Sequence, residues 1–273
     1  MQSASASQIT LPAQDLGFTP HKALYEINLE SASSGSQLVN IKGHMYYEWA
    51  YDCEAWNSRH SFNVLYEYAD NPAMRITSDF SNFERYDGSS LDYSAIREQN
   101  GVQYEEIRGH AEVPQNGEGL ARYNKPEGLE QSLPEGTLFP LAHTIKTISA
   151  IKDGKRFFNA TIFDGSDDEG PVEINAFIGK KVTEPRALSA AKDNDRLDEA
   201  LLNGAAHNVQ LAFFPQSKNE QEADYEMNLT LHHNSIISDM VIDYGDFKVS
   251  QDLIALEAID EAIDNDAIIK ACQ

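Results

Sequence analysis

The stretch VNIKGHMYYEW, residues 39–49, decides the fold class of this chain. Its odd-numbered positions are apolar, aromatic or glycine, and most of its even-numbered positions are polar. The two sets are Val39, Ile41, Gly43, Met45, Tyr47 and Trp49, and Asn40, Lys42, His44, Tyr46 and Glu48. Alternation with a period of two is typical of a half-buried β-strand, whereas an amphipathic helix repeats its apolar positions every three or four residues. We therefore predict a strand here with one face toward a core.

The same alternation recurs on both sides of this stretch, which predicts a mostly β chain. Further strands are expected at 22–30, 61–68, 73–86, 102–113, 119–124, 156–163, 172–178, 209–213, 225–231 and 236–249. Turn-forming residues, among them glycine, proline, asparagine and aspartate, lie between several of these runs. Residues 1–19 are predicted as a flexible N-terminal segment, and residues 20–273 as a single domain.

Three segments depart from the strand pattern. Residues 138–152 repeat their apolar side chains every three or four positions and end before Gly154, which predicts an amphipathic helix. Leu253, Leu256, Ile259 and Ile263 have the same spacing and predict a short C-terminal helix. The Ala-rich, charged segment 184–204 is predicted either as a short helix on a loop or as a mobile insertion.

The charge balance excludes some classes of partner. The chain has 44 acidic and 21 basic side chains, for a formal net charge of −23. A nucleic-acid-binding protein needs a basic stripe, so this class is excluded, and the net charge also argues against electrostatic docking on an anionic membrane. No run of about 18 apolar residues occurs, so we predict that the chain does not span a membrane.

The two cysteines, Cys53 and Cys272, leave two interpretations open. They form one long-range disulfide, which would require an oxidising compartment, or they are unrelated buried thiols in a cytosolic protein. The first residues are small and polar and lack the features of a signal peptide. We interpret this start as a mature N-terminus to which an initiator methionine was added, with a cytosolic origin as the alternative.

No catalytic residue, metal site or cofactor is predicted, because no complete motif for one occurs. One alternative is a glycan hydrolase that uses Glu48 with Asp52 or Glu54, while nearby tryptophans stack on sugar rings.

The acidic loop 164–170 suggests a calcium site, but it does not fit the EF-hand pattern. Counted from Asp164, that pattern needs Gly and Glu at the positions that Glu169 and Asn175 occupy. We interpret this loop as an acidic hairpin turn and leave open whether it binds calcium.

Several motifs together resemble a known family. They are PHKALY at 20–25, GHMYYEW at 43–49, Asp52-Cys53, Trp56, SDF at 78–80, YDG at 86–88, LPEGTLFP at 133–140, AHT at 142–144, FDG at 163–165, LAFF at 211–214, DYGDF at 243–247 and Cys272. The chain resembles the EipB cell-envelope-integrity family from about residue 20 to 272. The stretch 133–144 and the pairing of Asp52-Cys53 with a terminal cysteine are its most specific parts.

This resemblance implies a periplasmic protein whose signal peptide has been removed. It implies an antiparallel β-spiral, or open barrel, of two facing sheets with one interior helix. It also implies a disulfide between Cys53 and Cys272 and a role in envelope integrity without an assigned enzymatic activity. Segment 184–204 and His207 match no family motif, and no catalytic residue is carried over.

Two facing curved sheets often leave an apolar groove between them, and such grooves hold lipid chains or peptides. The candidate lining residues are Met45, Tyr47, Trp49, Phe62 and Tyr66, with plain core packing as the alternative. We therefore expect a non-enzymatic periplasmic protein that binds an envelope protein, a lipoprotein or a hydrophobic ligand. The envelope glycan hydrolase and a purely structural module are the rival hypotheses.

Overall fold

The computed structural model describes residues 17–51, 54–215 and 222–259. Within these ranges, fourteen strands form one antiparallel sheet. The strands are β1 His21–Ala32, β2 Leu38–Tyr51, β3 Ala55–Tyr68, β4 Met74–Arg85, β5 Ser90–Gln99, β6 Val102–Glu112, β7 Gly119–Lys125, β8 Glu130–Leu133, β9 Phe157–Ile162, β10 Val172–Val182, β11 Ala206–Pro215, β12 Tyr225–His232, β13 Ile237–Asp243 and β14 Phe247–Ala258.

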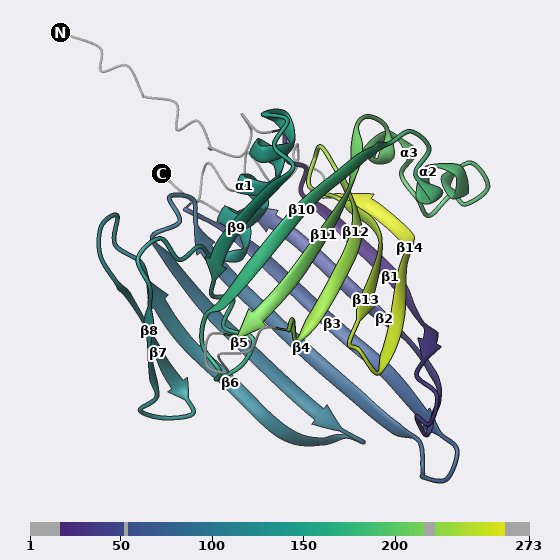
Figure 1. Cartoon of the computed structure of the whole chain (residues 1–273), viewed down its shortest axis with the longest axis horizontal. Coiled ribbons are helices and arrows are strands. Elements are labelled where there is room, and N and C mark those ends of the chain that lie inside the picture. The colour runs from purple at the N-terminus through teal and green to yellow at the C-terminus, as the bar shows by residue number, and fades with distance from the viewer. Residues whose placement is uncertain (1–16, 52–53, 216–221, 260–273) are drawn as a thin grey trace, which may run out of the picture.

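The strand order shows how the sheet is built. It runs from β8 back to β1, passes to β14, and continues back to β9, so two meanders join where β1 pairs with β14. The sheet curves until its two halves face each other, with β9 to β12 in front of the first half (Figure 1). It does not close, because β8 and β9 are its two edges. The predicted mostly β fold is confirmed, and the two facing sheets are halves of one continuous sheet.

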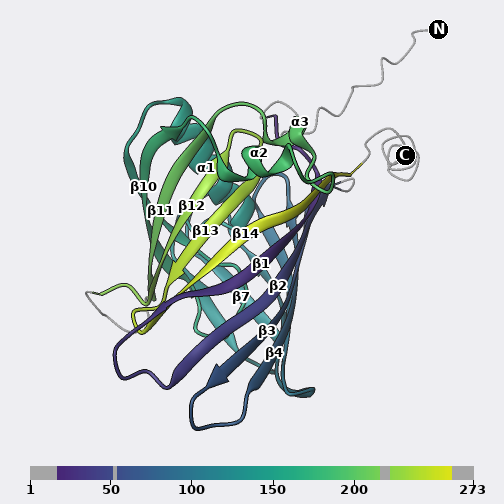
Figure 2. The same ribbon diagram turned by 90° about the vertical axis from the view of Figure 1, so that its right-hand side faces the viewer.

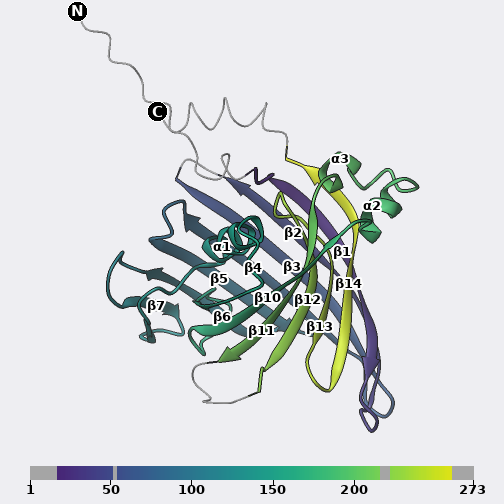
Figure 3. The ribbon, with the colours of Figure 1, turned by 45° about the horizontal axis from the view of Figure 1, so that its top comes forward.

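Three helices accompany this sheet among the described residues. They are α1 Pro140–Lys152, α2 Arg186–Ala191 and α3 Glu199–Leu202. The predicted interior helix is therefore confirmed as α1, which starts at a proline and lies between the two halves at one end of the molecule (Figure 3). Proline suits this first position, because its missing N–H would have no partner within the helix.

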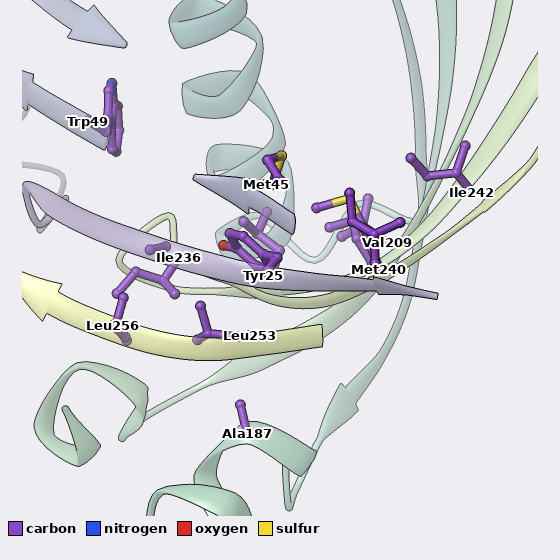
Figure 4. Packing of buried hydrophobic residues seen from close by; sticks show 14 of the residues in the cluster. Tyr25, Met45, Trp49, Ala187, Val209, Ile236, Met240, Ile242, Leu253 and Leu256 are labelled. Atoms are coloured by element: carbon purple, nitrogen blue, oxygen red, sulfur yellow. The ribbon is translucent and has the colours of Figure 1, made fainter. Parts of the chain in front are cut away.

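The main core lies between the two halves and draws side chains from both. Its members include Tyr25, Met45 and Trp49 from β1 and β2, and Val209 and Met240 from the other half (Figure 4). These side chains are nearly all hidden from solvent, with exposed fractions of 1 to 8%. Burial of such a cluster is the main favourable contribution to the free energy of folding.

The predicted C-terminal helix is wrong over the residues that the structure describes. Leu253 and Leu256 lie in strand β14, which extends to Ala258. In the pairing of β14 with β1, Leu253 lies opposite Tyr25, and Ala255 lies opposite Leu24. Ile254 between them has no partner on β1, so the register shifts at this point. This β-bulge inserts one residue, so two inward-facing leucines are three positions apart, a spacing that resembles a helix. Residues 260–273 lie outside the described ranges.

Segment 184–204 forms the two short helices α2 and α3, next to β13 and β14 (Figure 2). Ala187, Leu197 and Leu202 are buried members of the main core. Of the two alternatives, a short helix on a loop therefore describes the structure better than a mobile insertion does. At the N-terminus, Phe18 lies within the segment that was predicted as flexible, but its side chain is buried against Trp49, with ring centroids 5.5 Å apart.

Two strands were missed by the pattern analysis. Strand β5 has the inward residues Leu91, Tyr93, Ala95 and Arg97, and this mixture of small, polar and apolar groups hides the alternation. Strand β8 has only four residues, too few to show a period. The expected single run at 236–249 is instead the strands β13 and β14 with a turn at Gly245 between them.

Candidate functional site

The five predicted groove residues share the concave face of the sheet. Met45 and Phe62 are direct partners across β2 and β3, and Tyr47, Trp49 and Tyr66 lie on the same face by alternation. Met45 and Trp49 are buried members of the core, each 5% exposed. Tyr47, Phe62 and Tyr66 are half-buried and pack against that core. The set therefore divides into two core residues and three that keep contact with solvent.

A second group of aromatic side chains lies on the other half of the sheet. Phe213 of β11 stacks on Tyr225 of β12, with ring centroids 4.2 Å apart. Tyr225 lies 5.9 Å from the ring of Tyr244, and Tyr244 lies 5.0 Å from Phe247 of β14. This row crosses three strands and the turn between β13 and β14, and three of its four rings are half-buried.

The two groups approach each other at the same end of the molecule. Burial, with smaller contributions from the nearby hydroxyls of Tyr244, Tyr68 and Tyr104, raises the pKa of Tyr66 to about 12. Phe62 contacts Phe80 of β4 edge to face at 6.0 Å. We call these seven residues the concave aromatic cluster: Phe62, Tyr66, Phe80, Phe213, Tyr225, Tyr244 and Phe247.

The opposite end of the space between the halves is filled by packing. Trp49 and Trp56 stack with centroids 4.5 Å apart, and Phe18 covers Trp49. Glu84 of β4 accepts hydrogen bonds from the first N–H groups of α1, at Leu141 (2.7 Å) and Ala142 (2.9 Å). Burial raises the pKa of Glu84 to about 7. This carboxylate therefore fixes the start of α1 over the packed end.

Glu48, the carboxylate common to both forms of the hydrolase hypothesis, lies away from the stacked tryptophans. Glu48 lies on the convex face, because its neighbour Trp49 points into the core. Glu48 accepts a hydrogen bond from the hydroxyl of Tyr46 at 2.5 Å, and Glu54 pairs with Arg85 at 2.8 Å. Asp52 lies outside the described residues. Tryptophans stacked in a core cannot stack on a sugar that is bound beside Glu48 on the other face.

Glu48 does line an open depression on the convex face of β2 to β5, with a volume of about 380 Å³. Its walls also carry Arg59, Phe83 and Asp92. Both facing carboxylates already have partners, since Asp92 Oδ1 lies 2.7 Å from Nδ1 of His110. The depression therefore shows no free acid–base pair.

The acidic loop 164–170 is docked on the concave side of the first half. Its main-chain carbonyls accept hydrogen bonds from side chains of four strands. These are Asn82 to Asp164 (3.3 Å), Arg97 to Ser166 (2.8 Å), Tyr123 to Asp167 (3.0 Å) and Gln131 to Asp168 (2.9 Å). Phe163, just before the loop, is buried between the rings of Tyr93 and Tyr123. The loop thus joins the two halves near the open edges of the sheet.

Sequence reasoning missed this docking role, and it also missed the second aromatic row. The alternation at 209–213 and 225–231 placed these side chains on one face, but only the curvature of the sheet brings that face opposite Tyr66. Cys53 and Cys272 lie outside the described residues, so their pairing stays a prediction. In the described ranges, no cluster of metal-binding side chains occurs, and no helix has the length and apolarity to cross a membrane.

Comparison with known proteins now identifies the family. A family model described as EipB-like matches residues 12–260. The chain belongs to the EipB-like family. This membership agrees with the resemblance found in the sequence motifs, and it covers the whole of the curved sheet.

Two comparisons match this EipB-like chain to protein from Brucella abortus. The protein of strain 2308 named cell envelope integrity protein EipB is 25% identical over 251 residues, which cover 91% of this chain and 87% of the relative. A crystal structure titled as a β-barrel-like protein of a domain of unknown function has a TM-score of 0.80 and 26% identity. That match covers 89% of this chain and 99% of the other, so the EipB-like fold is shared over nearly its full length.

Proposed function

We propose that this protein maintains envelope integrity in the periplasm as a non-enzymatic binding protein, and that its ligand is an acyl chain of an envelope lipid or lipoprotein. The envelope role is supported by the name of the Brucella abortus relative. The binding role is supported by one observation above all. The concave aromatic cluster keeps several large rings only half-buried on a face that elsewhere forms the core.

The chemistry of the cluster favours an apolar chain. Its phenylalanines offer hydrocarbon surface, and its tyrosines combine an apolar ring with a polar tip, which suits the boundary between a ligand and water. Met227 and Leu211, which are register partners, add half-buried aliphatic surface beside the rings. Ligand sites are usually lined by such apolar side chains with a few polar groups.

The difference between the two ends of the region between the sheet halves supports the same ligand. The tryptophan-packed end is closed by core side chains and α1, whereas the aromatic rings at the other end reach solvent. A chain that enters at the aromatic end would meet increasingly buried apolar surface, including Met45 and Val64. A folded protein partner would contact the rings at this end and leave the interior unchanged.

A binding experiment tests the proposal. The purified protein, stripped of lipid, is titrated with a fluorescent fatty acid, and lipids extracted before stripping are identified by mass spectrometry. Phe213→Ser removes a stacked ring and should raise the Kd for the probe about tenfold, since burying such a side chain is worth about 1.5–3 kcal/mol. Phe213→Leu keeps apolar surface and should restore most of the affinity.

The matched control is Phe157→Ser, which removes an aromatic ring from the outer face, 59% exposed. It should leave the Kd unchanged. Absence of both saturable probe binding and co-purified lipid would overturn the proposal, and so would equal losses in Phe213→Ser and Phe157→Ser. Among the described residues, no observation favours the hydrolase, because Glu48 and Trp49 lie on opposite faces of β2.

A further inference from the structure

A basic and aromatic patch stands out on this acidic molecule. It surrounds the turn between α1 and β9 and the adjoining end of β10. Its six basic residues are Lys146, Lys152, Lys155, Arg156, Lys180 and Lys181, and its two aromatic residues are Phe157 and Phe177. Segments 146–158 and 177–182 contain one acidic side chain, Asp153, against these six cations. We call these eight residues the corner patch.

Strand register places the two phenylalanines together on the outer face. Phe157 of β9 and Phe177 of β10 are direct cross-strand partners. They are 59% and 45% exposed, whereas Ala176 and Ile178 beside them point into the core. Two neighbouring large apolar rings on the outside of a domain are a mark of an interaction surface.

The six cations differ in their contacts. Lys146 donates to the carbonyl of Asn159 (3.4 Å), and Lys155 pairs with Asp153 (3.2 Å). The guanidinium of Arg156 lies over the ring of Phe177, 5.2 Å from its centroid. The carbonyl of Arg156 accepts a hydrogen bond from the N–H of Ile178 (2.9 Å), which places the turn beside the end of β10 that carries Lys180. Among the residues that the structure describes, Lys152, Arg156 and Lys180 form no ion pair.

We propose that the corner patch docks the protein on a membrane surface that contains anionic phospholipid. Each lysine side chain near such a surface strengthens binding by roughly fivefold. Exposed aromatic rings between them can enter the boundary between headgroups and acyl chains. An acidic peptide would use the cations but would leave both phenylalanines without an apolar partner, so a bilayer fits the patch better.

The net charge of −23 does not prevent this docking, but it fixes the orientation. At physiological ionic strength, charges farther from the membrane than the Debye length of about 8 Å are largely screened. The corner patch is where cations and exposed rings coincide, so it approaches the membrane while the acidic surfaces face away. This inference is independent of the proposed ligand, because Phe157 and Phe177 lie on the outer face and the concave aromatic cluster lies on the inner face.

Vesicle flotation tests the proposal. The full chain is mixed with vesicles of pure phosphatidylcholine, or of phosphatidylcholine with phosphatidylglycerol. We expect binding only to the anionic vesicles, and a marked loss of binding when salt is raised from 0.1 to 0.5 M, because salt screens exposed charges. Lys180→Gln combined with Lys181→Gln should lower the partition coefficient by roughly tenfold or more.

The control is Lys22→Gln combined with Lys125→Gln, which removes two exposed lysines elsewhere and should leave binding within about twofold. Phe157→Ser should weaken binding at both salt concentrations. Thermal melts of all variants establish that they are folded. The proposal is overturned if the unaltered protein does not float with anionic vesicles, or if it binds both vesicle types equally. It is also overturned if the two double-lysine variants lose the same amount of binding. Binding to polyglutamate without binding to vesicles would also overturn it and would indicate an acidic polypeptide partner.

Discussion

At the scale of single residues, Glu84 links the sheet to α1. Its two carboxyl oxygens accept hydrogen bonds from the N–H groups of Leu141 and Ala142 at the start of the helix, which have no partner within the helix. Glu84→Ala should therefore lower the free energy of unfolding by about 1–3 kcal/mol. Urea unfolding monitored by circular dichroism measures this loss. Glu54→Ala removes an exposed ion pair and should cost less than about 1 kcal/mol, so equal losses in the two variants would contradict the capping role of Glu84.

Gly165 is the second residue with a specific prediction. It has φ +67°, in the left-handed region, and a Cβ at this position would collide with the ring of Tyr93. Gly165→Ala combines backbone strain with a clash in the aromatic packing and should destabilise the fold by about 2–5 kcal/mol. Gly117→Ala also has positive φ, but a Cβ there meets no atom within 4 Å. A melting temperature that drops equally in both variants would show that the Tyr93 contact has no effect.

At the scale of elements, the sequence predicts regular strands and fails where a local irregularity changes the period. Residues 39–49 predict β2 because their alternation is unbroken, and α1 is predicted because its apolar spacing ends at a glycine. The bulge at Ile254 shifts the inward face of β14 by one residue, which the pattern presents as helical spacing. The concave aromatic cluster is only half predictable, since Phe62 and Tyr66 follow from alternation within β3. The approach of Tyr66 to Tyr244 depends on the curvature of the sheet.

The cysteines, which lie outside the described residues, carry a prediction that comes from the family resemblance. If Cys53 and Cys272 form a disulfide, Cys272→Ser should lower the free energy of unfolding by about 2–5 kcal/mol, and the melting temperature by several degrees. Reducing agent should lower the melting temperature of the unaltered protein to that of Cys272→Ser. Identical mobility on reducing and non-reducing gels, with identical melting curves, would contradict the pairing.

At the scale of the whole molecule, buried histidines predict sensitivity to acid. Burial lowers the pKa of His21, His60, His143 and His232 to about 4, from an ordinary value of 6.5. Between pH 6.5 and 4 the unfolded chain therefore binds more protons than the folded chain, and stability falls as pH falls. Glu84 acts in the opposite direction, because its raised pKa gives the folded state an extra proton between pH 7 and 4.5. The combined effect of four histidines on the free energy of unfolding is larger than the opposite effect of one carboxyl group, so we expect a net loss of stability toward acid.

Thermal melts at pH 7, 6 and 5 check this expectation. The melting temperature should fall at each step, and His232→Gln should reduce the size of the fall if the variant folds. His44→Gln replaces an exposed histidine on β2 and serves as the control for the substitution itself. A melting temperature that stays constant or rises from pH 7 to pH 5 would contradict the assignment of neutral buried histidines.

The central claim, that an acyl chain enters between the halves at the concave aromatic cluster, is tested most directly by methionine-methyl NMR with a spin-labelled fatty acid. Met74 pairs with Tyr66, and Met227 lies beside the second aromatic row; both are half-buried. Met45 and Met240 are buried in the core at 5% and 8% exposure. We predict that the label broadens the signals of Met74 and Met227 first and most strongly, and that Phe213→Ser weakens this broadening. Equal broadening of all four signals, or no broadening at a saturating concentration of the fatty acid, would contradict the claim.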